Sequence, residues 1–321
     1  MIGKAIEKIY RDTLFTRKEP DGTIRYFSAE DFPGLKVEPF VFTAGQGHSL
    51  QGYFYSYEDK MPERLTVFDH GMGKGGHRAY MKEIVKIASE GCTVFAYDHT
   101  GCVKSGGQSN NGFAQSLNDL DACLSAIKKH PVYGGRSLSV IGHSWGAFST
   151  LNVIKFHPDV KNAVAMSGFI SVERMVGQFF KGILSPFRKR ILAIEREVNP
   201  VYSRVSALDT LRETKVNVLV VHSLDDKTVL AKYHFDVLRK GIEGKDNVRF
   251  LPLTGKNHNP NYTIEAVKYL NEFFSTLQRK QKQGKLKTEE EKEAFLNSYD
   301  WHKMTEQDEE VWEEIFKTLF A

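Results

Sequence analysis

Six short runs rich in β-branched residues, separated by segments of helical periodicity, constrain the fold of this chain more than any other feature. The runs cover residues 65–70, 93–99, 138–144, 160–168, 216–223 and 247–253. Helical patterns accompany them at residues 78–91, 114–130, 146–158, 232–242 and 262–280. Strands that alternate with helices are typical of βαβ units, whose strands are parallel. The sequence therefore predicts an α/β fold, with a mostly parallel central sheet and helices on both faces.

Two segments before the first of these runs have patterns of their own. Residues 38–58 alternate apolar and polar side chains around a Gly-Gln-Gly turn, which predicts an antiparallel hairpin at the edge of the sheet. Residues 1–15 carry scattered charges and no separate apolar stretch, so they indicate an amphipathic helix and not a secretory signal.

Two further segments interrupt or follow the alternation. Residues 170–206 insert amphipathic helices between two core strands, at the edge of the sheet where ligands bind, and we expect them to form a lid. Residues 279–321 form a helical extension, whose apolar positions we expect to pack on the body or on a second subunit of a homodimer. The predicted units are an N-terminal helix and lead-in (1–40), an α/β core (41–169 and 207–278), the lid (170–206) and the extension (279–321).

Composition excludes several classes of protein. A net charge of +4 over 321 residues is too small to indicate a nucleic-acid partner. No apolar run approaches the ~20 residues of a transmembrane helix. The three cysteines have no metal-ligand spacing and are odd in number, so we expect free thiols, a reducing compartment and a cytoplasmic protein. H-E-x-x-H and C-x-x-C patterns are absent from the sequence, so no metal is predicted.

The segment Gly142-His143-Ser144-Trp145-Gly146 carries the clearest chemical signal. It fits G-x-S-x-G and lies directly between a strand-like run and a helix-like run. A nucleophile on such a sharp strand-to-helix turn has a strained backbone and close neighbours on both sides, so glycines are needed at the flanking positions. The helix that follows directs its N-terminus at negative charge that develops during attack. Ser144 is therefore the predicted nucleophile.

A serine hydroxyl needs a base and an orienting carboxylate before it attacks, and both follow Ser144 in the sequence. Asp225 and Asp226 come after the run at 216–223, and His258 comes after the last run, in a loop rich in Gly and Asn. The order serine, acid, histidine, with each group after a strand, is an established triad arrangement. Asp226 is the predicted acid. Asp225 stays open as the alternative, since either residue could cap a following helix instead.

The loop VFDHGMGKGGH at 67–77 fits two different sites. Gly71, Gly73 and Gly76 match G-x-G-x-x-G, with Asp98 as a later ribose-binding acid, which would indicate a dinucleotide-binding oxidoreductase. Read from His70, the same loop is the His-Gly turn that supplies an amide donor in many serine hydrolases. Nothing else in the sequence requires a cofactor, whereas a nucleophile at Ser144 needs a second donor. The hydrolase interpretation is therefore the primary one, with no cofactor, and the oxidoreductase stays the alternative.

These motifs together resemble the α/β-hydrolase superfamily, and in particular its lidded branch of monoacylglycerol-lipase-like esterases and serine aminopeptidase-like hydrolases. The resemblance covers about residues 40–278. It rests on His70-Gly71, on GHSWG, on the loops of Asp226 and His258, and on DHTGCVKSGG at 98–107. The last segment is similar to the branch's D-x-x-G-x-G-x-S pattern, with Val103 where the second glycine is usual.

The resemblance implies an oxyanion hole formed by the backbone N–H groups of Met72 and Trp145. The predicted function is a serine hydrolase that cleaves small carboxylic esters through an acyl-enzyme intermediate. Hydrolysis of thioesters or small peptides by the same triad is the alternative within this class. Apolar side chains of the lid, and of the residue just before it, suggest a pocket for apolar or aromatic acyl groups. The candidate residues are Phe169, Met175, Phe179, Phe180, Ile183 and Leu184.

Overall fold

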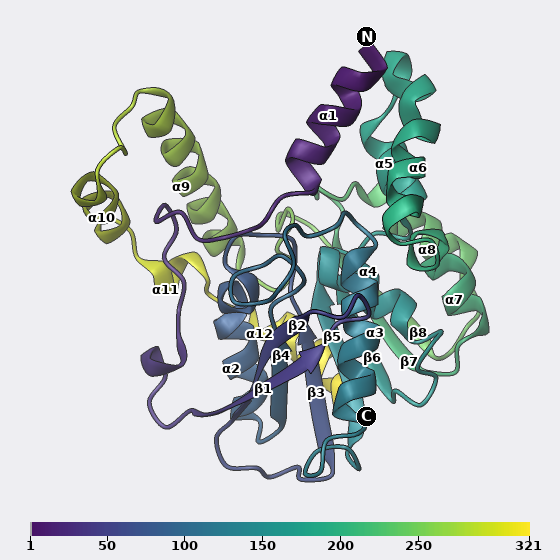
Figure 1. The fold of residues 1–321 in the computed structure, drawn as a ribbon. Helices are drawn as coiled ribbons and strands as arrows, with labels where there is room; N and C mark the ends of the chain where they lie inside the picture. Colours follow the sequence, from purple (N-terminus) through teal and green to yellow (C-terminus); the bar gives the residue numbers. More distant parts are fainter. Residues whose placement is uncertain (1) are drawn as a thin grey trace.

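The central sheet of the computed structural model, which describes residues 2–321, has eight strands in the order β1-β2-β4-β3-β5-β6-β7-β8 (Figure 1). The strands are β1 (Lys36–Thr43), β2 (Ser49–Ser56), β3 (Arg64–Asp69), β4 (Thr93–Tyr97), β5 (Ser137–His143), β6 (Asn162–Met166), β7 (Asn217–Ser223) and β8 (Val248–Leu253). β1 and β2 form the predicted antiparallel hairpin, and β2 pairs antiparallel with β4. All pairs from β4 to β8 are parallel.

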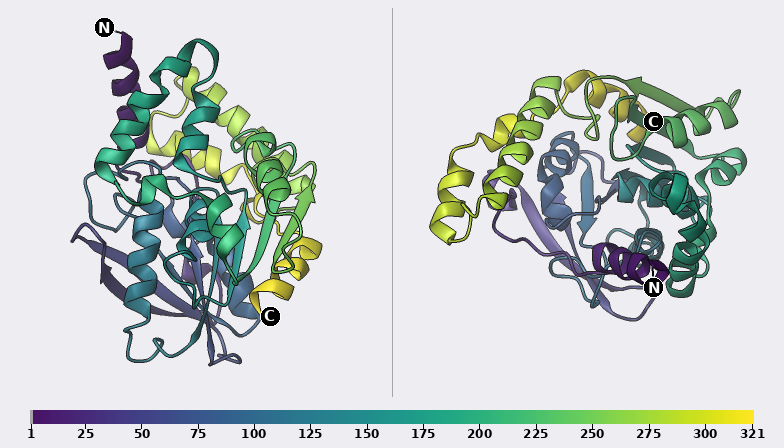
Figure 2. Two further views of the ribbon diagram at one scale, coloured as in Figure 1. Left: turned by 90° about the vertical axis from the view of Figure 1, so that its right-hand side faces the viewer. Right: turned by 90° about the horizontal axis from the view of Figure 1, so that it is seen from above.

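Helices cover both faces of this sheet (Figure 2). The α-helices of the described residues are α1 (Ile2–Leu14), α2 (Met81–Ser89), α3 (Gln115–Ile127), α4 (Trp145–Val153), α5 (Val172–Phe179), α6 (Arg188–Val198), α7 (Ala207–Glu213), α8 (Phe235–Gly241), α9 (Ile264–Lys282), α10 (Glu289–Asn297), α11 (Trp301–Met304) and α12 (Glu309–Leu319). Short 3₁₀ turns lie at Ala29–Asp31, Gly76–Tyr80, Gly182–Phe187, Tyr202–Arg204 and Ala231–Tyr233.

The strands are apolar at successive positions because both of their faces are buried. Along β5, Val140 belongs to the core on the side of α3, α4, α7 and α8, whereas Ile141 belongs to the core on the side of α2 and α12. Val220 and Val221 of β7 divide in the same way. Successive side chains of a strand point to opposite faces, so a sheet covered on both sides requires continuous apolar runs. This arrangement explains why the runs in the sequence do not alternate.

The C-terminal residues divide between an arm and the core. Helices α9, α10 and α11 form an arm to one side of the carboxyl end of the sheet (Figure 1), with a small apolar cluster that includes Phe273 and Phe295. Helix α12 returns to the sheet beside α2, and Trp312 is fully buried there. The prediction separated the extension at 279–321 from the core, but its last helix is part of the core. A homodimer through the extension stays a prediction, and these aromatic side chains are already used within the chain.

Helix α1 lies beside the inserted segment at 170–206, above the carboxyl ends of the strands (Figures 1 and 2). It contacts α6, and an ion pair joins Glu7 to Arg190 across the two helices. None of the helices in residues 2–321 has the length and apolar character that crossing a membrane requires.

Candidate active site

Ser144 lies on the turn between β5 and α4, with φ 56° and ψ −109°. Positive φ is strained for a residue with a side chain, and it persists only where the surroundings hold it. Here the Ser144 amide donates to the carbonyl oxygen of Met166 on β6, at 2.8 Å. The turn ends the strand and starts the helix within one residue, which places the Ser144 side chain at the carboxyl edge of the sheet.

The glycines on both sides of Ser144 are required by packing. A Cβ on Gly142 would overlap the carbonyl of Gly146, and a Cβ on Gly146 would overlap the carbonyl of Asp69 on the neighbouring strand β3. The backbone of α4 therefore approaches the sheet more closely than any side chain permits. This close approach is the physical reason for the G-x-S-x-G spacing in this chain.

Loops after β7 and β8 bring two predicted groups to Ser144. The Oγ of Ser144 donates to Nε2 of His258 over 2.8 Å, and Nδ1 of His258 donates to Oδ2 of Asp226 over 2.8 Å. Asp225 points elsewhere: its Oδ1 accepts from Oγ of Ser223 at 2.5 Å and from the Gly255 amide at 2.9 Å. Of the two adjacent carboxylates, Asp226 is thus the one in contact with His258, and Asp225 connects the two loops.

Asp226 is buried, and its environment keeps it charged. Burial alone would raise the pKa of its carboxyl group, but the hydrogen bond and the charge of His258, with the Val229 amide, lower the pKa overall. Its Oδ1 accepts from the amides of Thr228 and Val229, at 2.8 and 2.9 Å. A carboxylate held by two amides keeps its second oxygen directed at the imidazole.

Two other histidines contact the loops that carry His258 and Asp226. Nε2 of His143 donates to the carbonyl oxygen of His258 at 2.7 Å, while its Nδ1 accepts from the Tyr80 hydroxyl at 2.9 Å. Burial first, and then the neighbouring His258, lower the pKa of His143 to about 3, so this imidazole is neutral. His222 donates from Nε2 to the Val229 carbonyl at 2.9 Å. Both therefore support the loops of His258 and Asp226.

The loop after β3 lies beside the Ser144 turn. Nδ1 of His70 donates to the Gly71 carbonyl at 2.7 Å, and its Nε2 accepts from the His99 amide at 3.0 Å. His70 therefore fixes the turn that leads to Met72. Met72 and Trp145 line the same cavity as Ser144. The amides assigned to an oxyanion hole thus belong to two segments that meet at the nucleophile.

A buried charged cluster lies under this loop. Nε2 of His99 is 2.8 Å from Oδ1 of Asp69, and Nδ1 is 3.2 Å from Oδ2 of Asp119. Burial lowers the pKa of His99, but the two carboxylates outweigh it and raise that pKa to about 9. The ring packs on Trp145, with centroids 4.7 Å apart. The cluster had no signature in the sequence, because its members come from three separate segments.

A cavity of about 610 Å³ opens at Ser144. Five of the six predicted pocket residues line it, namely Phe169, Met175, Phe179, Phe180 and Leu184. Ile183 does not line the cavity and is 92% exposed, so its assignment to the substrate pocket is wrong. It lies in a 3₁₀ turn, Gly182–Phe187, where the helical spacing on which its assignment rested no longer applies.

The opposite wall of the cavity was not predicted. Helix α1 contributes five residues to the lining: Ile6, Ile9, Tyr10, Thr13 and Leu14. Phe113 and Thr228 also line it. The apolar positions of α1 recur at helical spacing, a pattern that indicates a buried face but does not indicate which cavity the face covers.

The dinucleotide alternative is wrong for the loop at 67–77. Asp98, its expected ribose-binding acid, is fully buried and accepts from the amide of His77 at 3.1 Å and from Nδ1 of that residue at 2.7 Å. A Cβ on Gly76 would overlap this carboxylate. The glycine thus makes room for a side chain of the same chain. Val103, where related patterns have glycine, adopts φ 43°.

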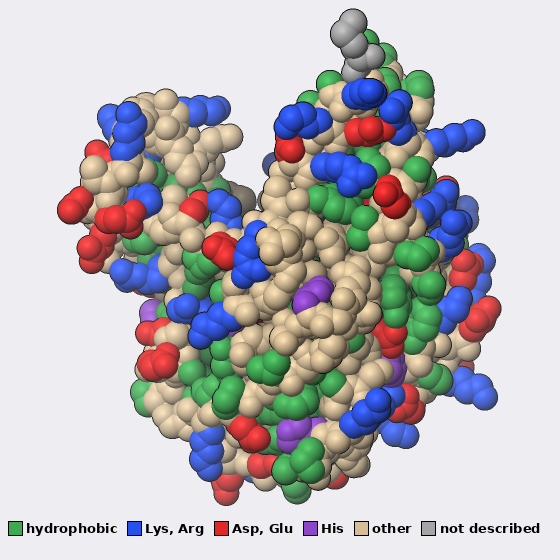
Figure 3. Space-filling view, viewed as in Figure 1, with side chains coloured by type: hydrophobic (Ala, Val, Ile, Leu, Met, Phe, Trp, Pro, Cys, Tyr) green, Lys and Arg blue, Asp and Glu red, His purple; other side chains and the backbone are tan. Residues whose placement is uncertain are grey.

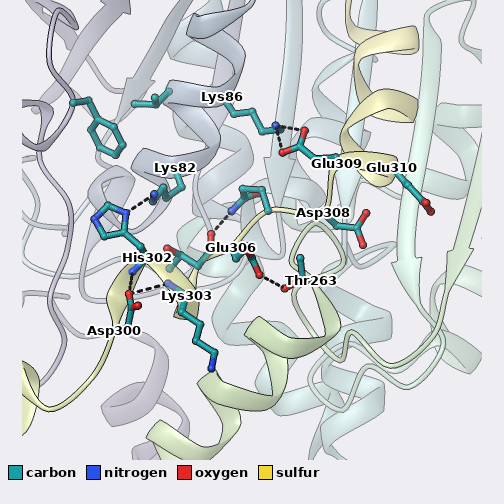
Figure 4. Close-up of a pocket in the computed structure, with 14 residues that line it drawn as sticks. Lys82, Lys86, Thr263, Asp300, His302, Lys303, Glu306, Asp308, Glu309 and Glu310 are labelled. Atoms are coloured by element: carbon teal, nitrogen blue, oxygen red, sulfur yellow. Dashed lines mark hydrogen bonds and ion pairs between the residues drawn. The ribbon is translucent and has the colours of Figure 1, made fainter.

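A second and larger hollow, of about 990 Å³, lies between α2 and the C-terminal segment (Figure 4). Charged side chains of both signs surround it, and several are paired with each other, as Lys86 is with Glu309 at 2.6 Å. Its lining includes none of Ser144, Asp226 and His258. Within residues 2–321, no cluster of three or more His, Cys, Asp and Glu side chains is arranged to hold a metal ion.

The fold and the serine on the turn after β5 define an α/β hydrolase, and comparisons with known proteins agree. The chain belongs to the serine aminopeptidase S33 family, whose family model matches residues 60–243. This places it among the serine hydrolases. No curated protein matches the sequence of the chain.

Several solved structures share the fold at low sequence identity. An esterase of Pyrococcus furiosus, Pf2001, has a TM-score of 0.59 and 17% identity, over 84% of this chain and 98% of its own. A hydrolase of Penicillium sp. sh18, GrgF, has a TM-score of 0.52 and 18% identity, over 76% and 98%. A dienelactone hydrolase assigned in Klebsiella pneumoniae has a TM-score of 0.55 and 14% identity, over 89% and 99%. These likenesses concern the fold.

Proposed function

We propose that this protein hydrolyses small carboxylic esters with apolar acyl groups through an acyl-enzyme intermediate on Ser144. One observation carries the proposal. The hydrogen-bonded chain Ser144–His258–Asp226 opens into a cavity whose lining, in the described residues, holds no Asp, Glu, Lys or Arg. A pocket of this character binds apolar groups by removing them from water, and it gives no partner to a charged one.

Acylation uses the three side chains in turn. Nε2 of His258 takes the proton as Ser144 Oγ attacks the acyl carbon, and the same nitrogen then gives that proton to the leaving alcohol. Asp226 accepts from Nδ1 of His258 over 2.8 Å, so it fixes the tautomer and stabilises the imidazolium that forms. Water then attacks the acyl carbon while Nε2 of His258 takes its proton. The same nitrogen returns that proton to Ser144 Oγ, and the acid is released.

The amides of Met72 and Trp145 are assigned to the oxyanion of the tetrahedral intermediates. Trp145 is the first residue of α4, so its N–H lies at the end of the helix where backbone donors lack helical partners. Each such donor is worth about 2.7–4 kcal/mol of transition-state stabilisation. Met72 supplies the second donor from the loop that His70 holds in place.

The family description raises a competing substrate class, because an aminopeptidase acts on a free α-amino group. Recognition of an ammonium group in an apolar cavity requires a carboxylate. Glu195 contacts two lining residues, but it is fully buried and accepts from the Tyr10 hydroxyl at 2.5 Å and from the Phe113 amide at 3.1 Å. It lies behind the wall of the cavity. This favours esters over aminopeptide substrates, and thioesters stay the alternative because they use the same machinery.

The test is labelling with a fluorophosphonate, followed by assays on p-nitrophenyl esters of increasing acyl length, leucine p-nitroanilide and an acyl-coenzyme A thioester. We expect wild type to be labelled, Ser144→Ala to be unlabelled and inactive, and esters to be the fastest substrates. An unlabelled wild type without ester hydrolysis would refute the proposal. Faster turnover of the anilide or the thioester would keep the triad and replace the substrate class.

A further inference from the structure

Residues 306–308 of the extension lie against the loop that carries His258. The Thr263 amide donates to the Glu306 carbonyl at 3.0 Å, and the Asp308 amide donates to the Asn261 carbonyl at 2.8 Å. Tyr262 and Gln307 pair as an antiparallel bridge between these two bonds. We call residues 306–308 the C-terminal clamp. It adds one β-bridge to a loop that also contacts Ser223, Asp225 and His143.

Side chains extend this contact to two helices. Nδ2 of Asn261 donates to Oε1 of Gln307 at 2.9 Å and to Oε1 of Glu83 at 3.0 Å. Glu83 lies on α2 and is buried. Nε1 of Trp312, on α12, donates to the same Gln307 oxygen at 2.8 Å. Asn261, three residues after His258, is therefore joined to α2 directly and to α12 through the clamp.

A buried lysine connects the other end of the loop to the clamp. Lys256 precedes His258 by two residues and is 5% exposed. Its Nζ donates to the Tyr262 carbonyl at 2.5 Å and forms an ion pair with Oδ2 of Asp308. Because an unpaired charge in such a place is costly, the loop is confined to positions that keep Lys256 against Asp308.

We propose that the C-terminal clamp positions His258 over Ser144, with Lys256, Asn261 and Asp308 as the positioning residues. The proposal rests on the proposed function, since it assigns these residues through the role of His258 as base. A base that is displaced by about 1 Å can lose roughly 100-fold in rate. His258 lies between Lys256 and Asn261, which both contact the clamp. Loss of the clamp therefore removes a support on each side of His258 and leaves its contacts with His143 and Asp226.

The outer face of the clamp supplies a matched control (Figure 4). Glu309 follows the clamp directly, and its carboxylate pairs with Lys86 of α2 at 2.6 Å on the solvent side. Among the described residues, its side chain forms no hydrogen bond or ion pair with residues 256–263. Glu309→Gln therefore removes a neighbouring ion pair to the same helix without touching the loop of His258.

Asp308→Asn is the most specific variant. Asp308 is also the N-cap of α12, where its Oδ1 accepts from the Val311 amide at 3.2 Å. Asn caps a helix as well as Asp does, so this substitution keeps the cap and removes the charge that faces Lys256. Asp308→Ala removes both, and Lys256→Met removes the other partner of the ion pair.

The experiment measures the rate of fluorophosphonate labelling of Ser144 over a range of reagent concentrations. In Asp308→Asn and Lys256→Met we expect the maximal labelling rate to fall roughly ten-fold, as loss of a charged hydrogen bond predicts. We expect the half-saturating concentration to stay within two-fold, because the cavity is untouched. The double variant should lose little more than either single variant, since both remove one contact.

The other variants and outcomes separate the clamp proposal from the proposed function. Asp308→Ala should match Asp308→Asn in labelling rate while unfolding at a lower temperature, and Glu309→Gln should label like wild type. If Asp308→Asn and Lys256→Met label at the wild-type rate, the clamp does not position His258 and the proposal is overturned. If wild type is not labelled at all, the proposed function fails instead.

Discussion

Two arms lie at the carboxyl end of the sheet, and they differ in the chemistry of the surface that each presents to the site. The lid arm (α1 with residues 170–206) lines the apolar cavity at Ser144. The extension arm (residues 264–308) presents charged and polar groups, which surround the hollow in Figure 4 and carry the clamp. In the space-filling view both arms carry charges outside, and hydrophobic side chains gather on the lid arm (Figure 3). Neither arm contributes a member of the Ser144–His258–Asp226 chain.

This difference suggests that the two arms have separate roles. Apolar contacts are tolerant of direction, so they suit a wall that accommodates acyl groups of varied shape. Hydrogen bonds and ion pairs depend on direction, so they suit a brace that must hold one imidazole in one place. We infer that substitutions in the lid arm change substrate preference, and that substitutions in the extension arm change the rate of the chemical step.

The largest effect is expected at Asp226, which belongs to neither arm. Asp226→Asn should lower kcat about 10⁴-fold, because an amide cannot hold the same tautomer of His258. Asp225→Asn is the matched control, and kcat should stay within about ten-fold, since Asp225 contacts Ser223 and Gly255 and not the imidazole. Steady-state kinetics on one ester measure both. A larger loss in Asp225→Asn would contradict this assignment of the acid.

A large side chain in the lid arm should change acyl preference with little effect on chemistry. Met175 lines the cavity and is buried, so Met175→Trp should lower kcat/KM for long acyl esters about 100-fold and leave acetyl esters nearly unchanged. Ile183→Trp changes the same arm at an exposed position outside the cavity and should alter neither. The measurement is kcat/KM against acyl length. An equal loss for all esters would remove the distinction between the arms.

The contact that holds α1 to the lid provides a smaller effect. Tyr10→Phe removes the hydroxyl that donates to the buried carboxylate of Glu195, which should lower the free energy of unfolding by about 1–3 kcal/mol. Tyr133→Phe, whose hydroxyl donates to Glu38 on the surface, should change it by less than about 0.5 kcal/mol. Denaturant titration measures both. Equal changes would show that the buried pair does not hold the lid arm.

The buried histidine under the Ser144 turn should make stability depend on pH without involving either arm. The carboxylates of Asp69 and Asp119 raise the pKa of His99 to about 9, above its ordinary value of 6.5. Its contribution to stability is therefore complete below about pH 6.5 and is lost as pH rises through 9. We expect the free energy of unfolding to fall by a few kcal/mol at most over this window. Nitrogen-15 NMR of the histidines would test this directly, and a neutral His99 at pH 7 would contradict it.

Local patterns in the sequence predicted most of the fold. Every predicted strand is present within a few residues of its expected place, because continuous apolar runs separated by helical patterns permit few other arrangements. The structure also brings Ser144, Asp226 and His258 together, and their sequence order had singled them out. Each follows a strand, and the carboxyl ends of parallel strands meet at one edge of the sheet.

Packing between distant segments could not be predicted in the same way. The face of α1 was visible as a helical repeat, but the sequence carried no sign that Ile6 and Tyr10 meet Phe169 across one cavity. Ile183 was misassigned for a related reason, because the chain leaves regular helical geometry at Gly182.

The sequence by itself determined the succession of strands and helices along the chain, the sharp turn at Ser144 and the loops of Asp226 and His258. These features follow from neighbouring residues, whose spacing and size limit the local backbone. Only the tertiary structure decided that α1 completes the cavity, that α12 belongs to the core, and that Asp308 faces Lys256. Those contacts join residues far apart in the chain, and the free energy that selects them comes from burial and pairing which no local pattern encodes.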